Sequence, residues 1–141
     1  MILLDTNVVA EIMKPHCDPA VAAFIDGQVL EELFLPSLVV AELRYGVRRL
    51  PEGRRRTEIE TRLEAFLAVG FASRILVFDA ACAAGYAVAR VTRERAGRSM
   101  QIQDALIGGM AVAHGATLVT RNVVDFDGYG LVLVDPWRKA Q

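Results

Sequence analysis

The chain begins with the stretch MILLDTNVV, residues 1–9, which decides how the rest of the sequence is interpreted. Met1–Leu4 is a continuous apolar run, which predicts a strand that is buried on both faces and ends at Asp5. A short helix is expected from Thr6 to Met13, because Pro15 stops it. A buried strand followed at once by a helix is typical of α/β proteins, in which helices cover both faces of a parallel sheet.

The same alternation of strand and helix continues along the chain. Further apolar runs predict strands at Leu33–Leu35, Ile75–Phe78, Thr117–Val119 and Leu131–Val134. Helices are expected over residues 19–27, 38–50, 54–69, 80–97 and 105–113, with Ser37 and Asp79 as N-caps of two of them. Because the strands are continuous apolar runs, the sequence predicts a three-layer α/β protein. Neither a linker nor a repeat interrupts residues 1–141, so we expect a single domain.

The composition limits the class of protein. With 141 residues and 53% hydrophobic side chains, the chain can bury a core, which excludes a disordered tail. Its two cysteines, Cys17 and Cys82, have neither the spacing of a zinc site nor that of a disulfide framework. No apolar run approaches the roughly 18 residues of a membrane-spanning helix. We therefore expect a cytoplasmic protein with no membrane partner.

The charges are unevenly distributed, although the formal net charge is −1. Residues 44–98 contain twelve arginines and six acidic residues, whereas the rest of the chain has four basic and eleven acidic residues. Arginine binds phosphate oxygens through paired hydrogen bonds and stacks on bases, so this distribution favours a nucleic-acid partner. A solvated helix face would give the same pattern, and charge alone does not separate the two interpretations.

Several polar side chains are expected at one edge of the sheet. Asp5 ends the first strand, Asn122 and Asp125 follow the fourth, and Asp104 lies at the head of a helix. Ligands of an open parallel sheet bind beyond the carboxyl ends of its strands, so these side chains can face one cleft. Each acid also has a structural alternative: Asp5 can cap a helix, Asp104 can complement a helix dipole, and Asp125 can belong to a turn.

Glu42 lies in the middle of a predicted helix, where its neighbours one turn away, such as Leu38 and Tyr45, are apolar or small. A carboxylate in such a setting costs free energy unless it is paired or binds a metal, which favours a functional role. Glycine costs a helix about 1 kcal/mol relative to alanine. We therefore expect Gly46 and the pair Gly108-Gly109 where elements pack closely around the site.

Converging carboxylates repel one another unless a cation neutralises them. Neither histidine nor cysteine belongs to this set of acids, and hard oxygen ligands select Mg²⁺ or Mn²⁺. A divalent ion held by carboxylates activates water and stabilises the charge that builds during phosphodiester cleavage. The residues therefore predict metal-assisted hydrolysis of a phosphate ester.

Four motifs occur in order: Asp5-Thr6-Asn7, Ala41-Glu42-Leu43 with Tyr45-Gly46, Asp104 before an apolar helix, and Thr120-Arg121-Asn122 with Asp125-Phe126. Together they resemble PIN-domain ribonucleases, in particular the VapC toxin family with its FitB-like members, over essentially the whole chain. The resemblance implies a three-layer α/β/α sandwich with a five-stranded parallel sheet. It also implies a Mg²⁺- or Mn²⁺-dependent endoribonuclease that is the toxin of a type II toxin–antitoxin pair.

The resemblance also implies a role for each acid. Asp5 and Asp104 would be the main metal ligands, and Glu42 would complete the acidic cluster and orient the attacking water. The fourth acidic position falls on Asn122 or on Asp125, and we expect Asp125, since many members have asparagine at the first place and the acid three residues later. Supporting roles would fall to polar neighbours, namely Asn7, Thr120 and Asn122.

Partners are implied in the same way. Members of this family usually form homodimers, and a small antitoxin with a DNA-binding domain inhibits them, so that the complex binds its own promoter. The substrate would be a loop of transfer RNA or ribosomal RNA. The helix over residues 54–62 is a candidate surface for RNA phosphates or for the antitoxin.

Two other functions fit parts of the sequence. A PIN-like module that binds RNA or protein without cleaving it would share the fold but has no need of four acids. A receiver-like domain would accept a phosphoryl group on Asp79, at the end of the third strand. Receivers need adjacent acids after the first strand and a lysine after the last. This chain has only Asp5 at the first place and no lysine between Lys14 and Lys139.

Overall fold

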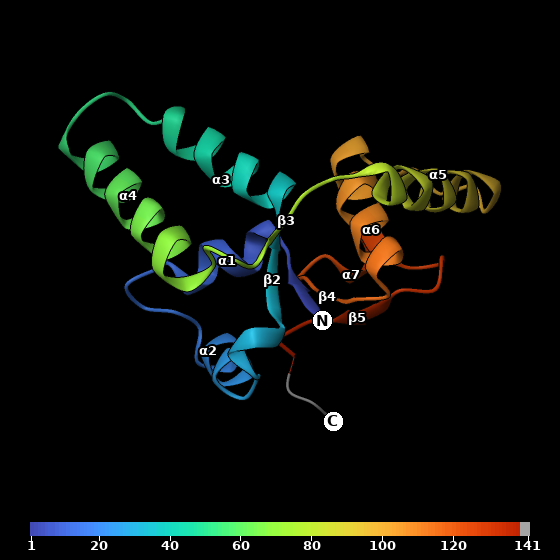
Figure 1. Ribbon diagram of the computed structural model, residues 1–141, viewed down its shortest axis with the longest axis horizontal. Coiled ribbons are helices and arrows are strands. Elements are labelled where there is room, and N and C mark those ends of the chain that lie inside the picture. Colours follow the sequence, from blue (N-terminus) through green and yellow to red (C-terminus); the bar gives the residue numbers. More distant parts are fainter. Residues whose placement is uncertain (139–141) are drawn as a thin grey trace.

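Strand β1, Ile2–Leu4, occupies the middle of a five-stranded parallel sheet in the computed structural model, which describes residues 1–138 (Figure 1). The strand order is β3-β2-β1-β4-β5, and every neighbouring pair is parallel. The remaining strands are β2 (Leu33–Pro36), β3 (Ile75–Leu76), β4 (Thr117–Val119) and β5 (Val132–Val134). The predicted α/β fold with a parallel sheet is confirmed.

Helices join the strands and cover the sheet. The α-helices are α1 (Thr6–Ile12), α2 (Pro19–Asp26), α3 (Ser37–Arg48), α4 (Arg54–Ala65), α5 (Ala80–Arg95), α6 (Ile102–His114) and α7 (Val123–Phe126). A 3₁₀ turn precedes β2 at Leu30–Glu32, and a π-helical turn follows α4 at Phe66–Gly70. Figure 1 shows α3 and α4 as a hairpin, separated by β1 and β2 from the pair α5 and α6.

The core forms where the strands meet the inner faces of the helices. Leu3, Leu4, Leu35 and Leu118 are completely buried, as expected for strands that are covered on both faces. This packing holds β1 on every side, so the residue that follows it, Asp5, emerges at a fixed place on the carboxyl edge of the sheet.

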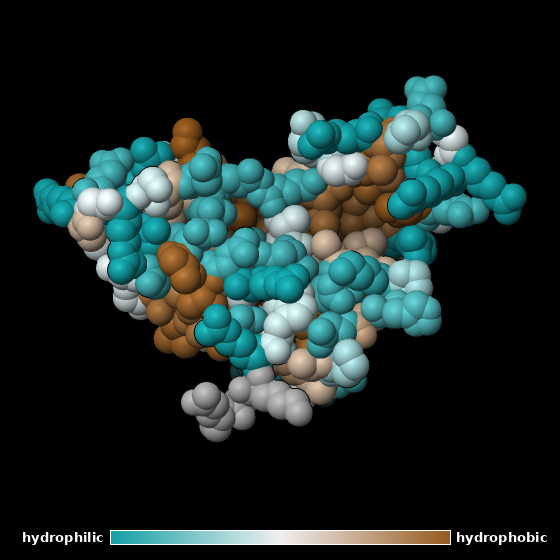
Figure 2. Space-filling model, turned by 180° about the vertical axis from the view of Figure 1, so that it is seen from behind, coloured by the Kyte–Doolittle hydropathy of each residue, from teal (hydrophilic) through white to brown (hydrophobic). Residues whose placement is uncertain are grey.

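On the face shown in Figure 2, an apolar hollow lies on the side of the molecule that carries the α3–α4 hairpin, and a second apolar patch lies on the other side of this view. A pocket of about 250 Å³ lies between α1, α3 and α4, with an apolar lining that includes Met13, Val47 and Ile59. Within residues 1–138, no helix has the length and apolarity that crossing a membrane requires.

Most predicted helix ends agree with the structure. The carboxylate of Asp79 caps α5 by accepting a hydrogen bond from the Cys82 amide at 3.0 Å, and Gly115 ends α6 in the left-handed conformation. The prediction for Ser37 was wrong: β2 runs directly into α3, so Pro36 holds the cap position and Ser37 is already helical. Helix α6 begins at Ile102, three residues earlier than predicted, and the short helix α7 was not predicted.

The glycines of α5 and α6 let these two helices cross in close contact. A Cβ atom on Gly109 would lie 2.5 Å from the backbone nitrogen of Tyr86, and one on Gly85 would collide with the carbonyl of Gly109. At Gly108, a Cβ atom would collide with the hydroxyl of Tyr129. The prediction for Gly46 was wrong, because a Cβ atom there would meet nothing within 4 Å.

Candidate active site

Asp5 is the most enclosed of the predicted site residues. It ends β1 and caps α1, and it is 5% exposed. Its carboxylate accepts hydrogen bonds from the Thr6 amide at 2.8 Å, the Asn7 side chain at 3.1 Å and the Thr120 hydroxyl at 2.7 Å. Burial raises the pKa of Asp5 above its ordinary value, although these three hydrogen bonds oppose the shift; the charge of Asp125 adds to it.

Thr120 and Asn7 connect the carboxyl ends of the neighbouring strands β1 and β4. The Thr120 hydroxyl, which donates to Asp5, also accepts from the Asn122 amide at 3.1 Å. The Asn7 side chain donates to Asp5 and accepts from the Arg121 amide at 3.2 Å. The segment after β4 is therefore tied to the end of β1 through the side chains that were predicted to support the site.

Glu42 approaches from α3 and is half-buried. The hydroxyl of Thr6 donates a hydrogen bond to its Oε2 atom, which fixes the carboxylate against the start of α1. Burial, followed by repulsion from Asp5 and Asp104, raises the pKa of Glu42 to about 7. A carboxyl group with a pKa near neutrality can exchange a proton at physiological pH.

Asp104 faces the same region from the first turn of α6. Burial and repulsion from Asp5 and Asp125 raise its pKa to about 6, and the positive charge of Arg93 opposes this shift. Glu42 and Asp104 line the same groove, and the charge of Asp5 contributes to the raised pKa of each.

The two candidates for the fourth acidic position lie on or beside α7. Asp125 is in the helix and exposed, and its charge reaches both Asp5 and Asp104. Asn122 precedes the helix and contacts Thr120 through its backbone amide. The structure thus brings all four predicted acids to one edge of the sheet, from four different elements.

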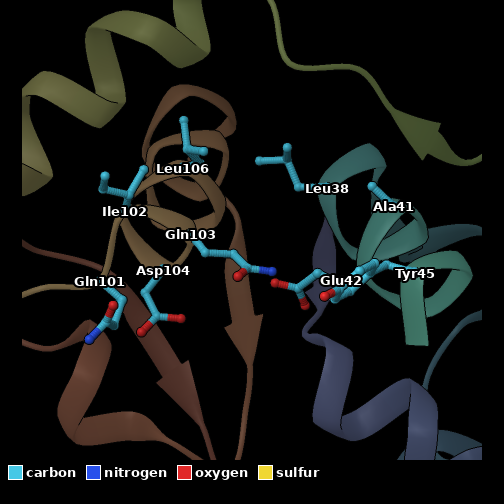
Figure 3. Close-up of a pocket in the computed structure, with 9 residues that line it drawn as sticks. All are labelled: Leu38, Ala41, Glu42, Tyr45, Gln101, Ile102, Gln103, Asp104 and Leu106. Carbon is cyan, nitrogen blue, oxygen red and sulfur yellow. The ribbon is translucent and has the colours of Figure 1, made fainter. Parts of the chain in front are cut away.

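A groove of about 670 Å³ runs beside the acids between α3 and α6. Glu42 and Asp104 lie in it, and Figure 3 shows the side chain of Gln103 reaching across the groove toward Glu42. The rest of the lining is mostly apolar or amide, namely Leu38, Ala41, Tyr45, Gln101, Ile102 and Leu106.

Arg93 of α5 is a residue that the sequence analysis did not single out. It is 5% exposed, and its guanidinium donates to the carbonyl oxygens of Val124 at 3.1 Å and Asp127 at 2.9 Å. It also forms an ion pair with the Asp127 carboxylate at 2.9 Å. These contacts hold both ends of the segment that carries Asp125, yet no local pattern around Arg93 predicts partners more than 30 residues away.

The donor set fits a hard divalent cation. Its side chains are carboxylates, with the oxygen ligands that Mg²⁺ and Mn²⁺ prefer. Among residues 1–138, no group of three or more histidine, cysteine or acidic side chains is close enough together to hold a metal ion as the side chains stand. Mg²⁺ usually keeps several waters and uses only one or two carboxylates, so an open cluster around Asp5 and Asp104 suits it better than a cage.

Comparison with known proteins agrees with this fold. Residues 2–128 match the model of the PIN domain family. The chain therefore belongs to the PIN-domain family. The receiver-like alternative is excluded, and Asp79 serves as the N-cap of α5.

Within that family the chain groups with the VapC and FitB proteins. It is 40% identical to VapC ribonuclease Y4jK of Sinorhizobium fredii, over 99% of this chain and 100% of that one. It is 37% identical to toxin FitB of Neisseria gonorrhoeae, over 97% and 99%.

Two solved structures extend this likeness to the fold. The chain superposes on the crystal structure of FitAcB from N. gonorrhoeae with a TM-score of 0.92 and 37% identity, covering 99% of this chain and 100% of that one. The TM-score is 0.78 at 29% identity with VapBC2 from Rickettsia felis, solved bound to a DNA fragment from their promoter; the match covers 94% of this chain and 97% of that one.

Proposed function

We propose that this chain is an endoribonuclease that requires Mg²⁺ or Mn²⁺ and acts as the toxin of a type II toxin–antitoxin pair. The observation that carries the proposal is the placement of Asp5, Glu42 and Asp104 at the carboxyl edge of the sheet: Glu42 and Asp104 line one groove, and Glu42 is held by Thr6 beside Asp5. Mutually repelling carboxylates cost free energy, and a divalent cation between them removes that cost.

Asp5 and Asp104 would hold the cation, and Asp125 would complete the cluster. When bound, the cation supplies positive charge that activates water and stabilises the charge that builds on the phosphodiester. Thr120 and Asn7 keep the Asp5 carboxylate in one orientation through the hydrogen bonds at 2.7 and 3.1 Å. We assign the fourth acidic position of the cluster to Asp125, and we expect Asn122 to shape the site.

Glu42 is the residue that we assign to proton transfer. Thr6 holds its Oε2 atom, so Oε1 is the oxygen that would accept the proton from the attacking water. The pKa of Glu42 is about 7 in the metal-free protein, and a cation held by Asp5 and Asp104 would remove the repulsive part of this shift and favour the ionised form that a base needs. In this scheme Glu42 would orient the attacking water, and Asp5 and Asp104 would hold the cation that supplies positive charge for the phosphodiester.

The relatives indicate the partners. Both solved structures described above are complexes, and one contains a DNA fragment from the promoter. We infer that this chain binds a cognate VapB- or FitA-like antitoxin, through which the complex reaches promoter DNA, and that it forms a homodimer. We expect it to act in the cytoplasm on a loop of transfer RNA or ribosomal RNA.

Cleavage of total RNA tests the proposal. Purified protein in Mg²⁺ or Mn²⁺ should give discrete fragments that disappear with EDTA and in the Asp5→Asn/Asp104→Asn double variant. Asp79→Asn is the matched control, because it changes the same kind of side chain at the cap of α5, away from the cluster. Folded, antitoxin-free protein that binds RNA but cleaves none with either metal would instead indicate a binding module.

A further inference from the structure

The groove beside the acids contains an aromatic ring that the proposed reaction does not use. Tyr45 follows Glu42 by three residues on α3 and lines the groove, yet it is 64% exposed. The guanidinium of Arg49 lies over the ring, 5.5 Å from its centroid. An exposed aromatic ring that lines a groove is available to stack against a ligand.

The opposite wall of the groove carries two amides. Gln101 and Gln103 flank Ile102 just before Asp104 on α6, and the Gln103 side chain extends toward Glu42 (Figure 3). A glutamine amide donates and accepts hydrogen bonds, as does the polar edge of a nucleobase. Ile102 is 62% exposed and adds an apolar surface between the two amides.

Charge decides which part of an RNA fits here. Glu42 and Asp104 repel phosphates except where a cation neutralises them. A nucleobase is uncharged and flat, so it can enter an acidic groove that excludes the backbone. Its faces match the ring of Tyr45, and its edge matches the amide of Gln103. Arg49 covers one face of this ring with a positive charge, which leaves the other face for a base and can attract the flanking phosphates.

We propose that the groove between α3 and α6 binds one unpaired nucleobase of the RNA, stacked on Tyr45 with its edge toward Gln103. That the ligand is RNA rests on the proposed function. The new element is the part of the RNA that this groove selects, namely a single base. Only an unstacked base can enter such a groove, so the strand must be single at the cut.

Binding is measured separately from cleavage. In an Asp104→Asn background with Ca²⁺, fluorescence anisotropy of a short fluorescein-labelled single-stranded RNA reports affinity alone. Because Tyr45→Leu removes the ring on which the base would stack, it should weaken binding about tenfold. Tyr45→Phe keeps the ring and should bind within about twofold of the parent.

Tyr86 on α5 provides the matched control. It forms the same kind of pair, with Arg90 lying 5.9 Å from its ring centroid four residues later, but it does not line the groove. Tyr86→Leu should therefore leave the affinity unchanged. Equal loss in the Tyr45 and Tyr86 variants, or none in Tyr45→Leu, would overturn the proposal. Retained RNA affinity with lost antitoxin binding would also overturn it and assign this face to a protein.

A second measurement locates the base. Once a cleaved site is mapped, single abasic nucleotides are placed at each position around it, and KM and kcat are measured with wild-type protein and Tyr45→Leu. One abasic position should raise KM as much as Tyr45→Leu does, and combining the two should raise it no further. Fully additive effects at every position would overturn the proposal. Tyr45-dependent binding without any cleavage would refute the ribonuclease function and leave the base site standing.

Discussion

Glu42 and Asp104 hold protons in the metal-free protein at a pH where ordinary carboxyl groups are ionised. Their pKa values are about 7 and about 6, against ordinary values of 4.5 and 3.8. The folded state therefore binds these protons more tightly than the unfolded chain does. These two protonated groups stabilise the folded state fully at pH values below the pKa values that they have in the unfolded chain. This stabilisation is lost as the pH rises through the pKa values that they have in the folded protein.

We therefore expect the Tm of the metal-free protein to fall as the pH rises from about 5 to about 8. Thermal unfolding in EDTA, followed by circular dichroism, would measure this fall. Mg²⁺ at the upper pH should restore several degrees, because a ligand that binds only the folded state stabilises it. Glu42→Gln removes one of the repelling charges, so its Tm should depend less on pH. A wild-type Tm that stays constant over this range would contradict the assignment.

At the scale of elements, the crossing of α5 and α6 depends on glycines that face the other helix. A Cβ atom on Gly109 would meet the backbone of Tyr86, which cannot rotate away as a flexible side chain would. Because α6 carries Asp104, the position of this acid depends on how closely α6 lies against α5.

Gly109→Ala should lower the free energy of unfolding by about 1–3 kcal/mol, since overpacking forces the backbones apart. Gly46→Ala on α3 is the matched control: its Cβ atom has open space, so the better helix propensity of alanine should raise the free energy of unfolding by up to about 1 kcal/mol. Urea denaturation of both variants measures the difference. Equal effects would show that the close contact at Gly109 carries no energetic weight.

The sequence was informative wherever the signal was local. Apolar runs marked all five strands, and the acid at the end of β1 was visible because Asp5 interrupts such a run. Helix α7 has only four residues, too few to show a helical period. The contacts of Arg93 with residues 124 and 127 depend on how α5 and α7 pack, which no local pattern encodes. The same holds for the bond from Thr6 to Glu42.

At the scale of the whole molecule, part of the arginine excess serves the α3–α4 hairpin. Ion pairs within and between these helices join Arg44 to Glu64 at 2.9 Å and Arg54 to Glu58 at 2.9 Å. These side chains are exposed, so such pairs contribute little stability each. The excess of arginine over residues 44–98 is therefore partly neutralised on the surface itself and is weaker evidence for RNA binding than the acidic site.

We propose that residues 1–141 fold as one cooperative domain, since a single sheet and a continuous core include every described strand. Calorimetry should show one transition with an enthalpy of about 0.7 kcal/mol per residue near 60 °C, or about 100 kcal/mol in total. This value should equal the van 't Hoff enthalpy. Two separable transitions would show that the chain contains more than one folding unit.

The central position of β1 also sets the time at which the site can form. Asp5 and Glu42 come early in the sequence, whereas Asp104 and Asp125 come far later, and Thr120 reaches Asp5 from the end of β4, which pairs with β1. A ribosome makes the chain from its N-terminus, so a nascent chain carries two of the four acids long before the others exist. The ribosome must therefore pass Asp125 before any RNA, including the messenger being read, meets a complete cluster.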